Sequence, residues 1–98
     1  MDMKIVDDAL NNLVERLAAI EHERWAHWQT CVHSKATRMS DGSLVLPPEL
    51  VTRWERQLGT AYADLGEEEK QSDREQIQRY LPLIRKSLIQ ALGSTAPT

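Results

Sequence analysis

The fold of this chain is decided by residues 10–32, which read LNNLVERLAAIEHERWAHWQTCV. Apolar residues return at steps of three and four through this stretch, which is the spacing of one face of an α-helix. The row consists of Leu10, Leu13, Val14, Leu17, Ile20, Glu21, Arg24, Trp25, Trp28, Cys31 and Val32. We therefore expect a long first helix from about Asp7 to about His33, with Asp7 or Asp8 as its N-cap.

Charged residues interrupt the apolar rows of two predicted helices. Glu21 and Arg24 lie in the row of the first helix, and Asp73 and Arg74 lie in the row of the last. Burying a charge is unfavourable unless a group of opposite charge pairs with it. We therefore expect the first and last helices to pack antiparallel, so that Glu21 and Arg24 meet Asp73 and Arg74. Such a cluster is either a structural ion network or a polar pocket.

A loop and a short helix are predicted between the two long segments. Residues 34–48 form the loop, within which residues 44–46 can be extended. Pro47-Pro48 suits the first turn of a helix, where proline is tolerated, and this second helix stops at Gly59.

The last predicted helix begins at the acidic run from Glu67 and contains a proline. Pro82 should kink or split this helix near Tyr80, because proline lacks the N–H group that an interior position donates. Gly93 suits the C-cap. The predicted fold is an all-α bundle of three main helices: a long first, a short middle and a proline-kinked last helix. It forms one domain over residues 1–93, followed by a flexible tail over residues 94–98.

The composition narrows the class of protein. The 98 residues include 12 basic and 15 acidic side chains, a net charge of −3, whereas nucleic-acid-binding proteins usually have a basic excess. No apolar run approaches the roughly 20 residues that a membrane span needs. The first residues lack the apolar stretch of a secretion signal. The single cysteine, Cys31, cannot form an internal disulfide, which fits a reducing cytoplasm.

The residue types of catalytic and metal sites do not occur at the required spacing. His22 and His27 are five residues apart, whereas two histidines on one helix bind zinc when they are four apart. Cys31 continues the apolar row, which is typical of a buried structural cysteine rather than a nucleophile. Glu21 and Asp73 could act as acid and base, but their spacing does not require it. We therefore expect no enzymatic activity, no metal and no cofactor.

Two groups of side chains allow both a structural and a ligand-binding interpretation. Trp25 and Trp28 lie on one helix face, where they either pack in the core or form the wall of a pocket for a flat ring. Basic residues gather in and after the first helix, where they either complement the helix dipole or bind an anion. These basic residues are Arg24, His27, His33, Lys35 and Arg38.

Two short motifs resemble the ryanodine-receptor-type (RyR) domain. Members typically have a Glu-His-x-x-Trp helix, a leucine-containing approach and then a Glu-Lys-x-x-Asp-Arg helix. The corresponding segments are Glu21-His22-Glu23-Arg24-Trp25, Tyr62-Ala63-Asp64-Leu65 and Glu69-Lys70 with Asp73-Arg74. The similarity spans about residues 17–92. Where the family usually has a Gly-Trp-x-Tyr-Gly segment, this chain has residues 34–38 and then an additional helix around Trp54.

The resemblance implies a small helical domain of the kind found in bacteria. Such domains are proposed to recognise nucleotide-derived signals in conflict systems, and short stand-alone chains of this type resemble phage and mobile-element proteins. A phage protein that binds or sequesters a host defence signal in the host cytoplasm is consistent with that resemblance. This is an analogy at the level of the fold, and the function has to be argued from the site.

Two functional hypotheses follow. In the first, a non-enzymatic protein binds a small anionic, nucleotide-derived ligand, with a tryptophan stacked on the ring and arginines on the phosphate. In the second, the charges are purely structural and the helices bind another copy of the chain or a host protein. The residues assigned to the ligand site are Glu21, Arg24, Trp25, Trp28, Tyr62, Asp73 and Arg74.

The length of the first helix also predicts self-association. A helix over residues 7–33 is about 40 Å long, whereas a compact chain of this size has a radius of gyration of about 13 Å. Unless Asn11-Asn12 breaks the helix, its apolar beginning around Leu10 and Val14 overhangs the globule and needs a partner. We therefore expect a homodimer or a higher oligomer.

Overall fold

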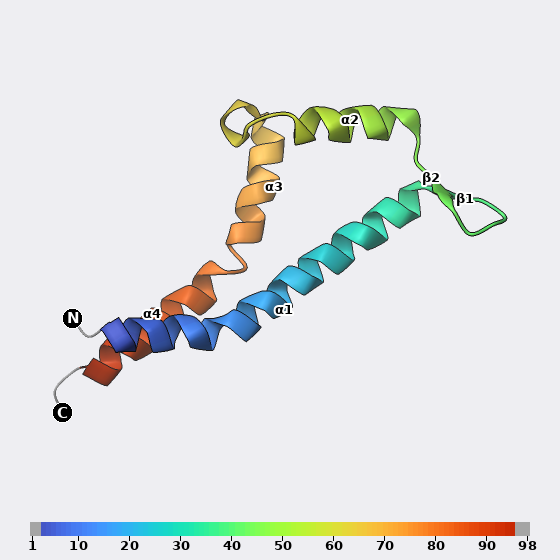
Figure 1. Ribbon diagram of the computed structural model, residues 1–98. Coiled ribbons are helices and arrows are strands. Elements are labelled where there is room, and N and C mark those ends of the chain that lie inside the picture. The colour runs from blue at the N-terminus through green and yellow to red at the C-terminus, as the bar shows by residue number, and fades with distance from the viewer. Residues whose placement is uncertain (1–2, 96–98) are drawn as a thin grey trace. The chain divides into compact units, whose positions relative to one another are not determined.

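The structure is a computed structural model that describes residues 3–95, with side chains as far as Gly93. It confirms the all-α class with a long first helix, a short middle helix and a bent last segment (Figure 1). The elements are α1 (Met3–Lys35), β1 (Thr37–Arg38), β2 (Leu44–Val45), α2 (Pro48–Leu58), a 3₁₀ turn (Tyr62–Asp64), α3 (Glu67–Ile77) and α4 (Leu81–Thr95). Two compact units divide the described residues: 3–24 with 73–95, and 25–72.

The start of the first helix and the end of the last helix both differ from the sequence prediction. α1 is already helical at Met3, so Asp7 and Asp8 are interior residues and the predicted N-cap is wrong. The carboxylate of Asp8 instead pairs with Lys4 one turn earlier, at 2.9 Å. The helix runs without a break through Asn11-Asn12, because asparagine lowers helix propensity only modestly. At the other end α4 continues past Gly93 to Thr95, so the predicted C-cap is also wrong, and residues 96–98 lie outside the described residues.

The first unit is an antiparallel pair of helices, in which α4 runs beside the first half of α1 (Figure 1). The Ser87 hydroxyl donates to the backbone carbonyl of Ala9 at 3.2 Å. Closer to the start of α4, Tyr80 donates to the carboxylate of Glu21. Residue numbers therefore rise along α4 as those of its partners on α1 fall. Leu13 is the one apolar side chain of the described residues that is buried, at 4% exposure.

Pro82 separates α3 from α4 at the predicted place. The amide of Tyr80 donates to the carbonyl of Ile77, which tightens the chain into a turn, and the amide of Ile84 then bonds to Tyr80 to start the next helix. Pro82 has no N–H to donate, and its ring would collide with the carbonyl four residues earlier in a continuous helix. The prediction of a split near Tyr80 is therefore confirmed.

The second unit contains the hairpin, α2 and the start of α3. The predicted extended segment is confirmed as β2, and it pairs antiparallel with β1, which the sequence did not predict. Gly42 occupies the turn with a φ of 90°, a conformation that glycine adopts without strain. The Asp41 carboxylate accepts bonds from the Ser43 backbone N–H at 2.9 Å and from its hydroxyl at 2.6 Å. As predicted, α2 begins at Pro48 and ends before Gly59.

We expect Leu13→Ala to lower the free energy of unfolding by about 2–4 kcal/mol, since the contact between α1 and α4 loses its one buried apolar side chain. Urea unfolding at a fixed protein concentration measures the change. The matched control is Leu58→Ala, the same substitution at a side chain that is 86% exposed, which should cost less than about 0.5 kcal/mol. Equal losses for the two variants would contradict this account of the helix pair.

Candidate functional site

A polar cluster lies where α1 and the turn before α4 meet in the first unit. The Glu21 carboxylate accepts hydrogen bonds from Arg24, one turn later at 3.0 Å, and from the hydroxyl of Tyr80. Next to it, Arg79 pairs with Glu23 at 2.5 Å. We call these five residues the Glu21 cluster. The helical spacing of three residues brings Arg24 to Glu21, and the break at Pro82 places Arg79 and Tyr80 opposite them.

The electrostatics of the Glu21 cluster favour its charged carboxylate. The hydrogen bond from Tyr80, followed by that from Arg24, lowers the pKa of Glu21 below its ordinary value. The same bond raises the pKa of Tyr80, because a phenolate beside a carboxylate would be repelled. The neighbouring carboxylate likewise raises the pKa of Arg24. Each of these groups therefore holds its neighbour in the protonation state that it has at neutral pH.

The predicted burial of the four charged residues is wrong. Glu21 and Arg24 are about half exposed, and Asp73 and Arg74 are exposed on α3. The residue that contacts Glu21 from the turn before α4 is Tyr80, which the sequence analysis did not assign to the site. The apolar spacing of α1 continues through Glu21 and Arg24. However, α4 contacts α1 on another side of the helix, which includes Ala9 and Leu13. The exposed ion pairs thus cost little desolvation.

The aromatic residues of the predicted site lie in the second unit, where Trp25 and Trp28 are both exposed rather than packed in a core. The ring of Trp28 meets that of Trp54 edge to face, with centroids 5.3 Å apart. The ring of Tyr62 lies 5.8 Å from the Lys70 ammonium, a cation–π contact. Because Trp28 packs on Trp54, one of its sides is occupied by an aromatic neighbour.

The seven residues assigned to a ligand site are divided between the two units. Glu21, Arg24, Asp73 and Arg74 belong to the first, and Trp25, Trp28 and Tyr62 belong to the second. Of these seven, the structure brings Glu21 and Arg24 into contact. A ligand role for the set stays a prediction.

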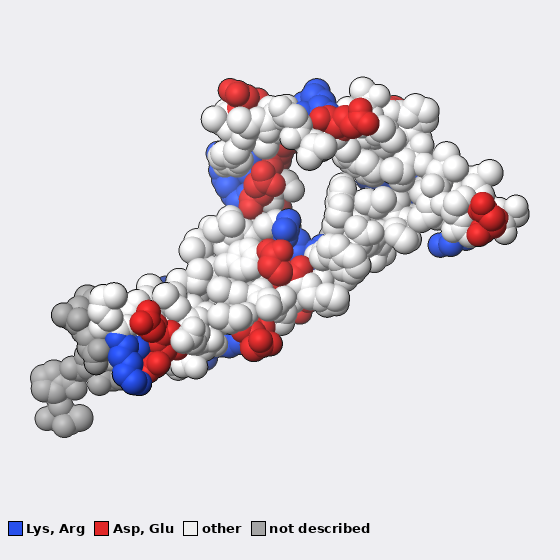
Figure 2. Space-filling view, in the orientation of Figure 1, with Lys and Arg blue, Asp and Glu red and all other residues white. Residues whose placement is uncertain are grey.

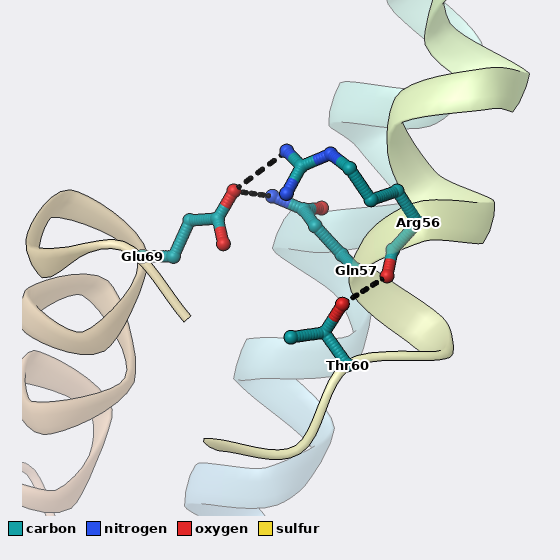
Figure 3. A network of polar contacts seen from close by, with 4 residues as sticks. All are labelled: Arg56, Gln57, Thr60 and Glu69. Atoms are coloured by element: carbon teal, nitrogen blue, oxygen red, sulfur yellow. Dashed lines mark hydrogen bonds and ion pairs between the residues drawn. The ribbon is translucent and has the colours of Figure 1, made fainter. Parts of the chain in front are cut away.

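A second polar cluster, absent from the predicted site, joins α2 to α3 within the second unit (Figure 3). One oxygen of the Glu69 carboxylate, Oε1, accepts from Gln57 at 2.9 Å and from Arg56 at 3.1 Å. These bonds lower the pKa of Glu69, Gln57 more than Arg56. The Thr60 hydroxyl bonds the carbonyl of Arg56 at 2.6 Å and completes the end of α2. Glu69 belongs to the acidic run that begins the last predicted helix, and nothing in the sequence distinguishes it from its neighbours.

The charged side chains form small mixed groups on the face drawn in Figure 2, where red and blue atoms lie next to one another. Residues 3–95 contain no group of three His, Cys, Asp or Glu side chains arranged to hold a metal ion. No helix within the described range is both long and apolar enough to span a membrane. Cys31 is a free thiol and partly exposed, whereas the sequence predicted burial.

A groove with mainly apolar lining runs along α4 in the first unit. Its apolar lining residues include Leu81, Ile84, Leu88, Ile89 and Leu92. None of the seven residues assigned to the ligand site lines this groove. Its polar lining residues include Arg85, Lys86 and Gln90, so the groove combines an apolar lining with basic side chains.

Comparison with protein families, curated proteins and solved structures finds no match to this chain. The resemblance to the RyR domain therefore stays a prediction that rests on two short motifs. The function is therefore inferred from the geometry of the described residues.

We expect Tyr80→Phe to raise the pKa of Glu21 toward its ordinary value, because the variant removes the strongest hydrogen bond to the carboxylate. NMR titration of the side-chain carboxyl carbons measures this pKa. Tyr62→Phe is the matched control, since Tyr62 lies in the other unit, and it should leave the pKa of Glu21 unchanged.

The same variant should alter how stability depends on pH. The lowered pKa of Glu21 stabilises the fold above the pKa of the unfolded chain, and this contribution is lost as pH falls through the folded pKa. The raised pKa of Tyr80 stabilises below the unfolded value, and this contribution is lost as pH rises through the folded pKa. Tyr80→Phe should therefore reduce the loss of stability at low pH and the loss of stability at high pH. A stability curve of unchanged shape would contradict the assignment.

We expect Glu69→Gln to loosen the end of α2, because the neutral amide gives weaker hydrogen bonds to Arg56 and Gln57 than the carboxylate does. Backbone amides of residues 55–58 should exchange with solvent about fivefold faster, as measured by hydrogen exchange. The control is Glu68→Gln on the exposed side of the same helix. If both variants changed exchange equally, the Glu69 bonds would not hold α2 to α3.

Proposed function

We propose that this protein acts through protein–protein contacts, as a helical interaction module whose charged clusters stabilise its own fold. The observation that carries this proposal is the distribution of exposed side chains. The four charges assigned to a pocket are exposed, and Glu21 and Arg24 among them pair with each other, whereas many large apolar side chains are exposed as well. Large apolar patches on a soluble protein typically mark sites where another molecule binds.

The pairing of the charges supports a structural role. Glu21 occupies Arg24 and also accepts from Tyr80, so an anionic ligand at Arg24 would have to displace a carboxylate. Glu69 occupies Arg56 and Gln57 in the same way. Such displacement is unfavourable, because a carboxylate and a phosphate compete for the same guanidinium donors.

The apolar exposure supports a binding surface in each unit. In the first unit, the exposed apolar side chains are Met3, Val6, Leu10, Val14, Ile77, Leu81, Leu88, Ile89 and Leu92. In the second unit, they are Trp25, Trp28, Met39, Val45, Leu58 and Tyr62. Hot spots of protein interfaces are enriched in tryptophan and tyrosine, and the second unit has three such residues exposed.

Two measurements together test this proposal against a nucleotide-derived ligand. Sedimentation velocity over a hundredfold range of protein concentration should show a mass that rises above the 11.2 kDa of one chain. Calorimetry against a panel of linear and cyclic nucleotides and ADP-ribose derivatives should show no binding heat. Stoichiometric binding of a nucleotide that is abolished by Arg24→Ala or Trp28→Ala would instead establish the ligand hypothesis and overturn the structural one.

A further inference from the structure

Seven of the nine exposed apolar side chains of the first unit form one row on α1 and one on α4, whereas Ile77 and Ile89 lie outside these rows. On α1 the row is Met3, Val6, Leu10 and Val14, and on α4 it is Leu81, Leu88 and Leu92. Their exposed fractions lie between 41% and 75%, although the two helices are in contact. The spacing of three, four and seven residues keeps each row on one side of its helix.

Both rows lie on the same side of the helix pair. At about 100° per residue, the α1 row is displaced by roughly a quarter turn from the side that faces α4, marked by Ala9 and Leu13. The α4 row is displaced by roughly a quarter turn, in the same sense, from the side marked by the less exposed residues Ser87 and Ala91. Two antiparallel helices are related by a two-fold axis perpendicular to their common plane, so equal displacements turn both rows to one face. We call these seven residues the leucine face.

The opposite side of the pair is polar. On α1 the positions displaced in the other sense carry Lys4, Asp8, Asn12 and Glu15, all exposed. On α4 the corresponding positions carry Lys86 and Gln90, also exposed. The pair is therefore amphipathic as a whole. It has one face suited to water and one face suited to burial against another apolar surface.

From this arrangement we infer that the leucine face binds the leucine face of a second copy, and that the two helix pairs form an antiparallel four-helix bundle. The inference rests on the proposed function and names its partner. Two flat amphipathic helix pairs are self-complementary, and a symmetric dimer buries the same patch on both copies. Four-helix bundles of this kind pack around such apolar positions.

The area of the leucine face suits a weak dimer. Complete burial of a Val, Leu or Met side chain removes roughly 60–120 Å² of apolar surface from water, so seven half-exposed side chains offer about 200–400 Å² per copy. With a polar border of the usual proportion, the interface amounts to about 700–1,300 Å² over both copies. Stable interfaces begin near about 1,200 Å², so the dimer should dissociate on dilution.

Charge complementarity favours one of the two symmetric arrangements. Asp7 lies at the outer edge of the α1 row and Arg85 at the outer edge of the α4 row, and both are exposed. A two-fold axis parallel to the helices places each α1 opposite the partner's α4, antiparallel to it, and so brings Asp7 toward the partner's Arg85. An axis across the helices would instead place each α1 opposite its own copy and would not pair these charges.

The first experiment measures the dimer dissociation constant of the full chain by sedimentation equilibrium. Leu88→Glu places two charges in the interface and should raise the constant at least about 100-fold. The matched control is Lys86→Glu, a new carboxylate on the polar side of the same helix, which should change it less than about threefold. Circular dichroism of each variant reports whether the helices persist.

A second experiment does not depend on the stability of the Leu88 variant. Asp7→Arg and Arg85→Asp should each weaken the dimer, and an equal mixture of the two variants should form a heterodimer more tightly than either self-associates. In a Cys31→Ala background, chains with Leu10→Cys should cross-link by disulfide to chains with Leu88→Cys only when the two are mixed and oxidised. A mixed covalent dimer and restored association support the leucine face.

The remaining outcomes overturn the inference in distinguishable ways. Self-association that is unchanged by Leu88→Glu and shows no preference for mixed variants leaves the interaction module in place but moves the contact elsewhere. A chain that stays monomeric at every concentration overturns the dimer. If that monomer also binds a nucleotide through Arg24, the proposed function fails with it.

Discussion

The contact between α4 and the first half of α1 is the constraint on which the first unit depends. Leu13 is the buried apolar side chain of this contact, and Ser87 bonds the backbone of Ala9 across it. A single row of apolar contacts along two helices removes little surface from water compared with the entropy lost in ordering them. The pair therefore relies on its polar bonds at one end and leaves a second apolar row available for another molecule.

The polar clusters show how carboxylates join the elements of a small helical chain. Glu21 is about half exposed, whereas the Glu69 side chain is 20% exposed and its Oε2 is buried. Glu21 combines a neighbour on its own helix with a hydroxyl from another segment, whereas Glu69 of α3 accepts from two side chains of α2. Each carboxylate keeps access to water or to several donors, so its desolvation is limited. Such clusters contribute direction and register rather than large stabilisation. They also occupy the arginines that an anionic ligand would need.

The function of this chain is inferred from its exposed apolar surfaces. The Glu21 cluster accounts for Glu21 and Arg24 among the charged residues that first suggested a pocket, and it does not explain the leucines and tryptophans that are exposed. Apolar surface of this extent is unfavourable in water, and its presence on a chain with polar sides supports the proposal of an interaction surface. The leucine face of the first unit is the part of that surface for which symmetry, area and edge charges agree on one partner.

The local features of the chain could be predicted from sequence, because they depend on residues close to one another. The apolar period of residues 10–32 indicated the long helix, Pro47-Pro48 the start of α2, and Pro82 the break before α4. The helix ends were less predictable, since Asp7 and Gly93 are only preferences that a continuing helix overrides. Glu21 could be singled out as a charge in an apolar row, but Tyr80 and Glu69 could not.

Contacts between distant segments determine which side of each helix is covered. A period of three and four defines a face, and the choice of neighbour determines whether that face is buried. Here α4 contacts α1 along the line of Ala9 and Leu13, a quarter turn away from Leu10 and Val14, so the apolar row is exposed in part. That rotation made Glu21 and Arg24 surface residues, placed Tyr80 against them, and left several leucines exposed. Sequence alone determined the helices, because helix formation is local, whereas packing depends on contacts between residues distant along the chain.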